Sequence, residues 1–221
     1  MSKMERIVGL LALYCLAAIA VISGPPRFTN AARPVRGIDN PVLAMEVVRD
    51  AAEVDAILSD APSADREAMR LKQYADFGFI AGYAGLFVAM AMLLGRAAYT
   101  AGAIGVIAAA FDVAENVFIL RVVDTPLAAL TQAQIDAIRH ASMAKWGLAA
   151  LALGYFGLVL LRRPSIGPRI TGVFNLAACG LGLYGLYRNI FLAWTSFVMF
   201  AGFLTLAIWH FPRYRGRRRR A

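Results

Sequence analysis

The sequence is poor in charge and in cysteine. Only 17% of its 221 residues are charged, whereas a soluble domain has about 25%. The two cysteines, Cys15 and Cys179, lie inside apolar segments and have no CxxC partner, which excludes a disulfide framework and a zinc knuckle. Hydrophobic residues make up 60% of the chain, above the usual ~45–50%. This balance predicts one integral membrane domain.

Signatures of cofactor and nucleotide chemistry are also absent from the sequence. It contains no GxSxG, HExxH, Walker or GxGxxG pattern. The two histidines, His140 and His210, are expected on opposite sides of a membrane, so they cannot jointly hold one haem. We therefore expect no cofactor and no metal, and an enzyme is the less favoured class.

The apolar residues fall into six runs that approach the ~20 residues needed to cross a bilayer. The sequence thus predicts an all-α membrane protein, a bundle of six transmembrane helices over residues 7–23, 75–94, 98–120, 143–161, 170–187 and 190–210. The first run could also be a signal peptide, but it is longer than a typical ~7–15-residue signal core. The last two runs are separated only by "YRN", which favours a helical hairpin over one broken helix.

Basic residues predict the orientation. Lys3, Arg6, Arg96, the arginines of 162–169 and the tail 211–221 all fall on one side of six spans. Lys and Arg in short loops mark the cytoplasmic side, so we expect an inner (plasma) membrane protein with both termini cytoplasmic. The formal charge of +9 then reflects topology and anionic lipid headgroups at the Arg-rich tail, not nucleic acid.

Residues 24–74 form the one long connection between predicted spans, and we expect it on the extracytoplasmic side of the membrane. The first part is rich in Pro, Gly and Asn and predicts an irregular loop. From Pro41 onward, apolar residues at near-helical spacing predict an amphipathic helix on the outer surface, or a lid over the bundle. Ser63 and Asp65 are candidate caps of a further helix that could continue into the second span.

Three polar residues interrupt the third span. Asp112, Glu115 and Asn116 stand at i, i+3 and i+4, so they share one helix face, which continues upstream through the small residues Ala101 and Gly105. A charge at the centre of a membrane helix costs ~2.5–3.5 kcal/mol on insertion scales. We therefore expect this face to point into the bundle.

Other spans carry polar residues at a similar level. Asp76 and Tyr83 share a face at the outer end of the second span, and Lys145 opens the fourth. In a structural interpretation, Lys145 pairs with Asp112 or Glu115, and Asn116 bridges to backbone or to Tyr83. In a functional one, the cluster binds a lipid headgroup or a small solute. The two interpretations are equally favoured.

An alternative is an intramembrane enzyme, or an ion- or proton-translocating protein, that uses Asp112 and Glu115. Oxygen ligands from Asp76, Asp112, Glu115 and Asn116 would suit Mg²⁺ or Ca²⁺, but Lys145 at the same depth would repel a cation. The protein could equally be an accessory subunit or a homo-oligomer.

The stretches "ADFGFIAGYAGLF", "DVAENVFILRV" and "MAKWGL" carry a family resemblance. Between residues 45 and 150 the chain resembles a group of bacterial multi-pass membrane proteins with D-F-x-F-x-x-x-Y, D-x-x-E-N and K-[FW] motifs. The motifs fall on Asp76 to Tyr83, on Asp112 to Asn116, and on Lys145 with Trp146. The resemblance implies a shared polar core and no particular reaction.

Overall fold

The computed structural model describes residues 2–29, 34–61 and 63–210, and its regular elements are helices. The basic tail 211–221 lies outside the described residues. The long helices are α1 (Lys3–Ser23), α4 (Ala64–Leu94), α5 (Tyr99–Val123), α6 (Gln132–Leu161), α7 (Ile166–Tyr187) and α8 (Ile190–His210). Short elements are α2 (Pro41–Met45), α3 (Ala51–Leu58), η1 (Arg96–Ala98) and η2 (Leu127–Ala129).

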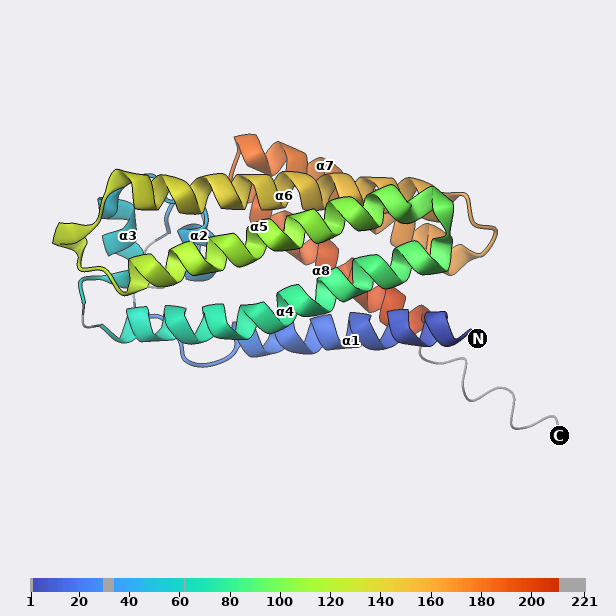
Figure 1. The fold of residues 1–221 in the computed structure, drawn as a ribbon, viewed down its shortest axis with the longest axis horizontal. Helices are drawn as coiled ribbons and strands as arrows, with labels where there is room; N and C mark the ends of the chain where they lie inside the picture. Colours follow the sequence, from blue (N-terminus) through green and yellow to red (C-terminus); the bar gives the residue numbers. More distant parts are fainter. Residues whose placement is uncertain (1, 30–33, 62, 211–221) are drawn as a thin grey trace.

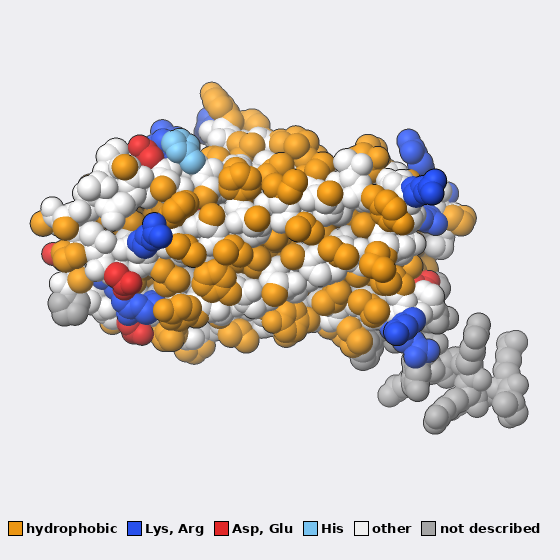
Figure 2. Space-filling view, in the orientation of Figure 1, with side chains coloured by type: hydrophobic (Ala, Val, Ile, Leu, Met, Phe, Trp, Pro, Cys, Tyr) orange, Lys and Arg blue, Asp and Glu red, His pale blue; other side chains and the backbone are white. Residues whose placement is uncertain are grey.

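Six of the helices among the described residues are long and apolar enough to cross a membrane, which confirms the predicted all-α fold and fits a multi-pass membrane protein. Hydrophobic side chains cover the middle of the face seen in Figure 2, and charged side chains gather toward its two ends. A break at Arg188 and Asn189 separates α7 from α8, so the predicted hairpin is correct.

The long helices form a closed ring. Each packs against the next in the order α1, α4, α5, α6, α7 and α8, and α8 returns to α1 (Figure 1). Neighbouring helices approach closely at glycines. A Cβ on Gly105 of α5 would lie 2.2 Å from the ring of Phe87 in α4, and a Cβ on Gly157 of α6 would lie 2.9 Å from a carbonyl oxygen of α7. Glycine is therefore required at both contacts.

Aromatic side chains pack in the core of the helix bundle. Phe87 of α4 stacks on Phe156 of α6 with centroids 5.7 Å apart, and Tyr83 meets Phe87 edge-on at 5.7 Å. These rings belong to the larger hydrophobic core, which also includes Val8 and Cys15 of α1. Because α1 contributes to this core, it is an integral part of the bundle.

Helices α4 and α6 are longer than a membrane requires. Their 31 and 30 residues span about 45 Å at ~1.5 Å per residue, against a hydrocarbon core of ~30 Å. Both project beyond the bundle at the end opposite the N-terminus, where they meet α2 and α3 (Figure 1). We call this the cap end, and we call residues 24–29 and 34–61 the cap. The other end, with the N-terminus, is the terminal end.

The cap differs from the single surface helix that the sequence pattern predicts. Asn40 caps α2 ahead of Pro41, as expected for a helix start, but the helix ends at Met45 and a new one begins after the N-cap Asp50. Instead of lying on a membrane surface, the apolar residues of the cap join a second hydrophobic core with the projecting helices. Val48, Val54 and Leu58 are completely buried there. The cap is a lid over the bundle.

Candidate functional site

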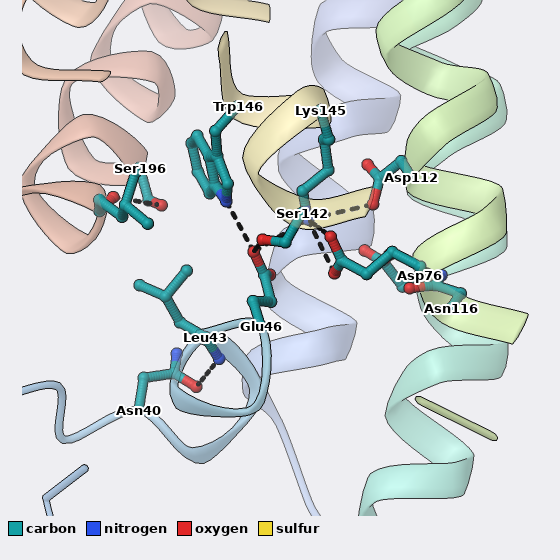
Figure 3. A network of polar contacts seen from close by, with 12 residues as sticks. Asn40, Leu43, Glu46, Asp76, Asp112, Asn116, Ser142, Lys145, Trp146 and Ser196 are labelled. Atoms are coloured by element: carbon teal, nitrogen blue, oxygen red, sulfur yellow. Dashed lines mark hydrogen bonds and ion pairs between the residues drawn. The ribbon is translucent and has the colours of Figure 1, made fainter. Parts of the chain in front are cut away.

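The six polar residues singled out in the sequence converge at one place in the bundle, with Lys145 of α6 at the centre. Its Nζ lies 2.9 and 2.8 Å from the two carboxylate oxygens of Glu115, and 3.2 Å from Oδ1 of Asp112. The predicted pairing of Lys145 is therefore present with both acids of α5. The space between α4, α5 and α6 holds this group (Figure 3).

Tyr83 and Asn116 extend the network toward α4. The hydroxyl of Tyr83 donates to Oδ2 of Asp112 at 2.8 Å, and the amide of Asn116 donates to Oδ2 of Asp76 at 2.8 Å. The expected bridge from Asn116 to backbone or to Tyr83 is wrong, because the amide reaches the carboxylate of Asp76. Side-chain hydrogen bonds thereby connect α4 to α5, and the ion pairs of Lys145 connect α5 to α6.

Glu46 of the cap completes the group, and sequence reasoning missed it. Its Oε2 lies 2.9 Å from Nζ of Lys145, and it accepts hydrogen bonds from the indole Nε1 of Trp146 at 2.6 Å and the hydroxyl of Ser142 at 3.3 Å (Figure 3). Glu46 stands four residues after Val42, so on a helix it would share the apolar face that Val42 belongs to. A carboxylate on that apolar face was the sequence signal that could have identified it. We call Glu46, Asp76, Tyr83, Asp112, Glu115, Asn116 and Lys145 the carboxylate–lysine centre.

The centre is closed off from its surroundings. Glu115 and Asn116 are each 1% exposed, Asp112 is 4% exposed, and Lys145 and Glu46 reach only 7% and 8%. Asp76 is the one member of the centre that is partly exposed. The expectation that the polar face of α5 points into the bundle is confirmed, and Asp76 forms the edge of the group.

The helix ends differ from those assumed for Asp76 and Lys145. Both residues were expected at the outer start of a span, but α4 begins twelve residues before Asp76 and α6 thirteen before Lys145. Helix α5 continues to Val123, three residues beyond the predicted span, which places Asp112 ~16 Å and Glu115 ~12 Å below its end. The reason is that the helices project past the membrane-spanning stretch into the cap.

The charges of the centre do not balance. Three carboxylates, Glu46, Asp112 and Glu115, share one ammonium group, Lys145, and a fourth, Asp76, accepts from the amide of Asn116 beside them. Two carboxylate oxygens, Asp112 Oδ1 and Glu115 Oε2, are buried without a well-aligned hydrogen bond, although Nζ of Lys145 lies at ion-pair distance from both. Uncompensated ions in a low-dielectric interior cost several kcal/mol each. The centre therefore holds more acid than its one ammonium group can neutralise.

Two other buried cations, Arg66 and Lys72, bind helix-end carbonyls and not carboxylates. The Arg66 guanidinium donates to the carbonyls of Val122, Val123 and Thr125 at the end of α5, at 2.7–3.1 Å. Lys72 donates to the carbonyls of Ile22 and Gly24 at the end of α1, at 2.6 and 2.7 Å. Helix C-terminal carbonyls lack intrahelical donors and attract cations. These two residues tie helix ends to α4 and lie outside the centre.

Metal binding at the centre is not what the geometry favours. Within residues 2–29, 34–61 and 63–210, no set of three or more His, Cys, Asp or Glu side chains is arranged to hold a metal ion. The ammonium of Lys145 stands where the carboxylate oxygens converge, so it occupies the position that a cation would take. His140 is exposed on α6, away from this group.

No protein-family model, curated protein or solved structure matches the chain.

Proposed function

We propose that this multi-pass membrane protein carries a buried proton-binding site, the carboxylate–lysine centre. The observation behind the proposal is the excess of acid: three carboxylates from the cap and α5 lie within 3.2 Å of one ammonium group, and a fourth, Asp76 of α4, joins the network through Asn116. Ionisable groups within a membrane bundle, paired with one another, are the usual elements of proton relays. Protons are the smallest species that can supply the missing positive charge in a closed site.

A proton fits the closed site better than a lipid headgroup or another solute. Two cavities among the described residues, of about 250 and 20 Å³, are lined by residues outside the centre. An enzymatic reaction at Asp112 and Glu115 would require a substrate in contact with these carboxylates, and both are buried by side chains of the bundle and the cap. Proton exchange requires only one partly exposed member of the network, and Asp76 is such a residue.

Infrared difference spectroscopy between pH 9 and pH 5 on the purified protein tests the proposal. We expect bands of buried protonated carboxyl groups, reduced in Glu115→Gln and unchanged in the control Glu67→Gln, whose side chain is 56% exposed. Circular dichroism and size-exclusion chromatography would verify that both variants are folded. If wild type and Glu115→Gln give the same carboxyl bands, the centre does not bind protons.

Reconstitution into vesicles distinguishes a static site from a pathway. If an enclosed pH-sensitive dye reports proton flux that Glu115→Gln abolishes, the centre is part of a translocation route. If the carboxyl bands titrate without flux, the centre is a local proton site that responds to pH. The accessory-subunit and homo-oligomer interpretations stay predictions, for which co-purification at fixed stoichiometry is the test.

We also propose that the terminal end faces the cytoplasm of a bacterial inner membrane. The described Lys and Arg residues at that end are Lys3, Arg6, Arg96, Arg162, Arg163 and Arg169, and the sequence adds the arginines of 211–221. Lys and Arg near span ends are retained on the cytoplasmic side. Labelling of single cysteines introduced at each end by a membrane-impermeant reagent would test the orientation.

A further inference from the structure

A cavity of about 250 Å³ opens at the terminal end of the bundle, at the far end from the carboxylate–lysine centre. Its wall in the body of the helices is apolar, with Met90 and Leu93 on α4 and Leu206 on α8. Arg163 and Ser165, in the connection from α6 to α7, line it where the helices end. The cavity thus combines an apolar interior with polar groups at the level of a membrane interface.

A smaller cavity of about 20 Å³ continues the apolar wall into the bundle. It shares Met90 and Leu206 with the first cavity and adds Phe87 and Phe203. Asn175 of α7 also lines it, is 8% exposed, and forms no side-chain hydrogen bond with any other described residue. We call the larger cavity, with the apolar wall of Met90 and Leu206 that it shares with the smaller one, the slot; the larger cavity supplies the room for part of an apolar chain, and the smaller one has room for about one water molecule.

Positive charge dominates the terminal end, where the larger cavity opens, and the charged residues that line the cavity itself are Arg163 and Glu5. Among the residues that the structure describes, six Lys and Arg side chains lie at the terminal end, and Glu5 is the one acidic residue there. The Glu5 carboxylate accepts a hydrogen bond from the backbone of Ser2 as part of the cap of α1. The Arg163 guanidinium uses one nitrogen to donate to the carbonyl of Leu94 at 3.0 Å, and its other two nitrogens bond to no described residue. A guanidinium has five N–H donors, so donors remain for an anion.

We propose that this slot binds a single acyl chain under an anionic head. The head lies against Arg163 and Ser165, and the chain runs between Leu93 and Leu206. Apolar burial of the chain contributes ~0.8 kcal/mol per CH₂ group. The charge-assisted contact with Arg163 selects an anionic head over a zwitterionic one. This lipid site is separate from the carboxylate–lysine centre, so the proposal does not depend on whether the centre binds protons.

Tryptophan fluorescence provides a direct test because Trp209 lines the cavity. The exposed Trp194, which contacts bulk lipid, is replaced by Phe in all samples to remove its quenching. One arm titrates nanodisc-embedded protein with a brominated stearic acid, and the other with a brominated phosphatidylglycerol; a brominated phosphatidylcholine is the zwitterionic reference. Saturable quenching by either anionic probe supports the site, and the arm that saturates identifies a fatty acid or a phospholipid as the source.

Two variants with matched controls connect the quenching to the slot. Leu206→Phe fills the slot and is expected to weaken binding at least tenfold, whereas Leu204→Phe alters a side chain on the same helix that is 42% exposed and should have no effect. Arg163→Gln should weaken the anionic probes toward the level of phosphatidylcholine, whereas the exposed Arg162→Gln should not. Quenching that does not saturate, or that is equal in all variants and for all three probes, overturns the proposal.

Discussion

Removal of the Lys145 ammonium is the most informative perturbation of the centre. In Lys145→Met the side chain keeps its length and loses its charge, so Glu46, Asp112 and Glu115 lose the group that lies within 3.2 Å of each. Breaking a buried ion pair by deleting one partner costs about 3–5 kcal/mol. For a chain of 150–250 residues, 1 kcal/mol corresponds to roughly 2–4 °C, so we expect Tm in detergent to fall by about 6–20 °C at pH 8.

The pH dependence of this loss separates charge from packing. Protons can replace the missing ammonium, so the loss of Tm in Lys145→Met should be smaller at pH 5 than at pH 8. A packing defect would be equal at both values. The control is Arg139→Gln, which removes a partly exposed ion pair with Asp136 and should cost less than about 1 kcal/mol.

A double-mutant cycle identifies the partner. Lys145→Met combined with Glu115→Gln removes both sides of the closest pair, and the combined loss should be smaller than the sum of the single losses by about 0.5–3 kcal/mol. Strictly additive losses, together with a Tm decrease that is the same at pH 5 and pH 8, would refute the assignment of Lys145 as the counter-ion of the centre.

Further predictions concern the cap and its surroundings. Glu46→Ala removes the acceptor of the Trp146 indole and should increase hydrogen exchange in residues 41–58 while the spans remain protected. Arg66→Met leaves the last carbonyls of α5 without donors and should cost about 1.5–3 kcal/mol, whereas the exposed-pair variant Arg70→Met should cost less than ~1 kcal/mol by thermal melting. The backbone N–H groups that bond to the Asp60 carboxylate lower its folded-state pKa. That stabilisation is present above the unfolded-state pKa of ~3.9 and is lost as pH falls through the lower folded value, so Asp60→Asn should flatten the acid limb of a stability–pH curve.

Much of the centre was predictable from the sequence because membrane physics restricts where charge can go. Acids at i, i+3 and i+4 on a helix that crosses a bilayer must face the interior, and that reasoning placed Asp112 and Glu115 correctly. The pairing with Lys145 follows because an isolated ammonium at that depth needs a counter-ion. The particular bond from Asn116 to Asp76 depended on helix rotation, which hydropathy does not specify.

The cap could not be predicted in the same way. Hydropathy locates the membrane-crossing stretch but not the length of the helix that contains it. The extension of α4 back to Ser63 was nevertheless predicted from the cap signal and is confirmed, whereas the extension of α6 was not predicted. The helix starts were visible as caps: Ser63 accepts from the backbone of Arg66, and Thr131 with Gln134 forms a capping box. Glu46 was not predicted as part of the centre because α2 ends beside it, so it belongs to no long periodic helix. Its contact with Lys145, 99 residues later in the chain, has no signature in the hydrophobic pattern.

Stability alone does not account for the number of acids in the centre. One carboxylate suffices to neutralise Lys145, and replacing a buried ion pair by apolar side chains is often neutral or stabilising. Yet Glu46 comes from a cap whose docking is already supplied by the burial of residues such as Met45, Val48 and Leu58. Each acid beyond the first adds a desolvation cost, which hydrogen bonds from Tyr83, Asn116 and Trp146 offset in part and a bound proton would remove. The surplus is therefore better explained by a site that gains and loses protons than by a network that merely holds helices together.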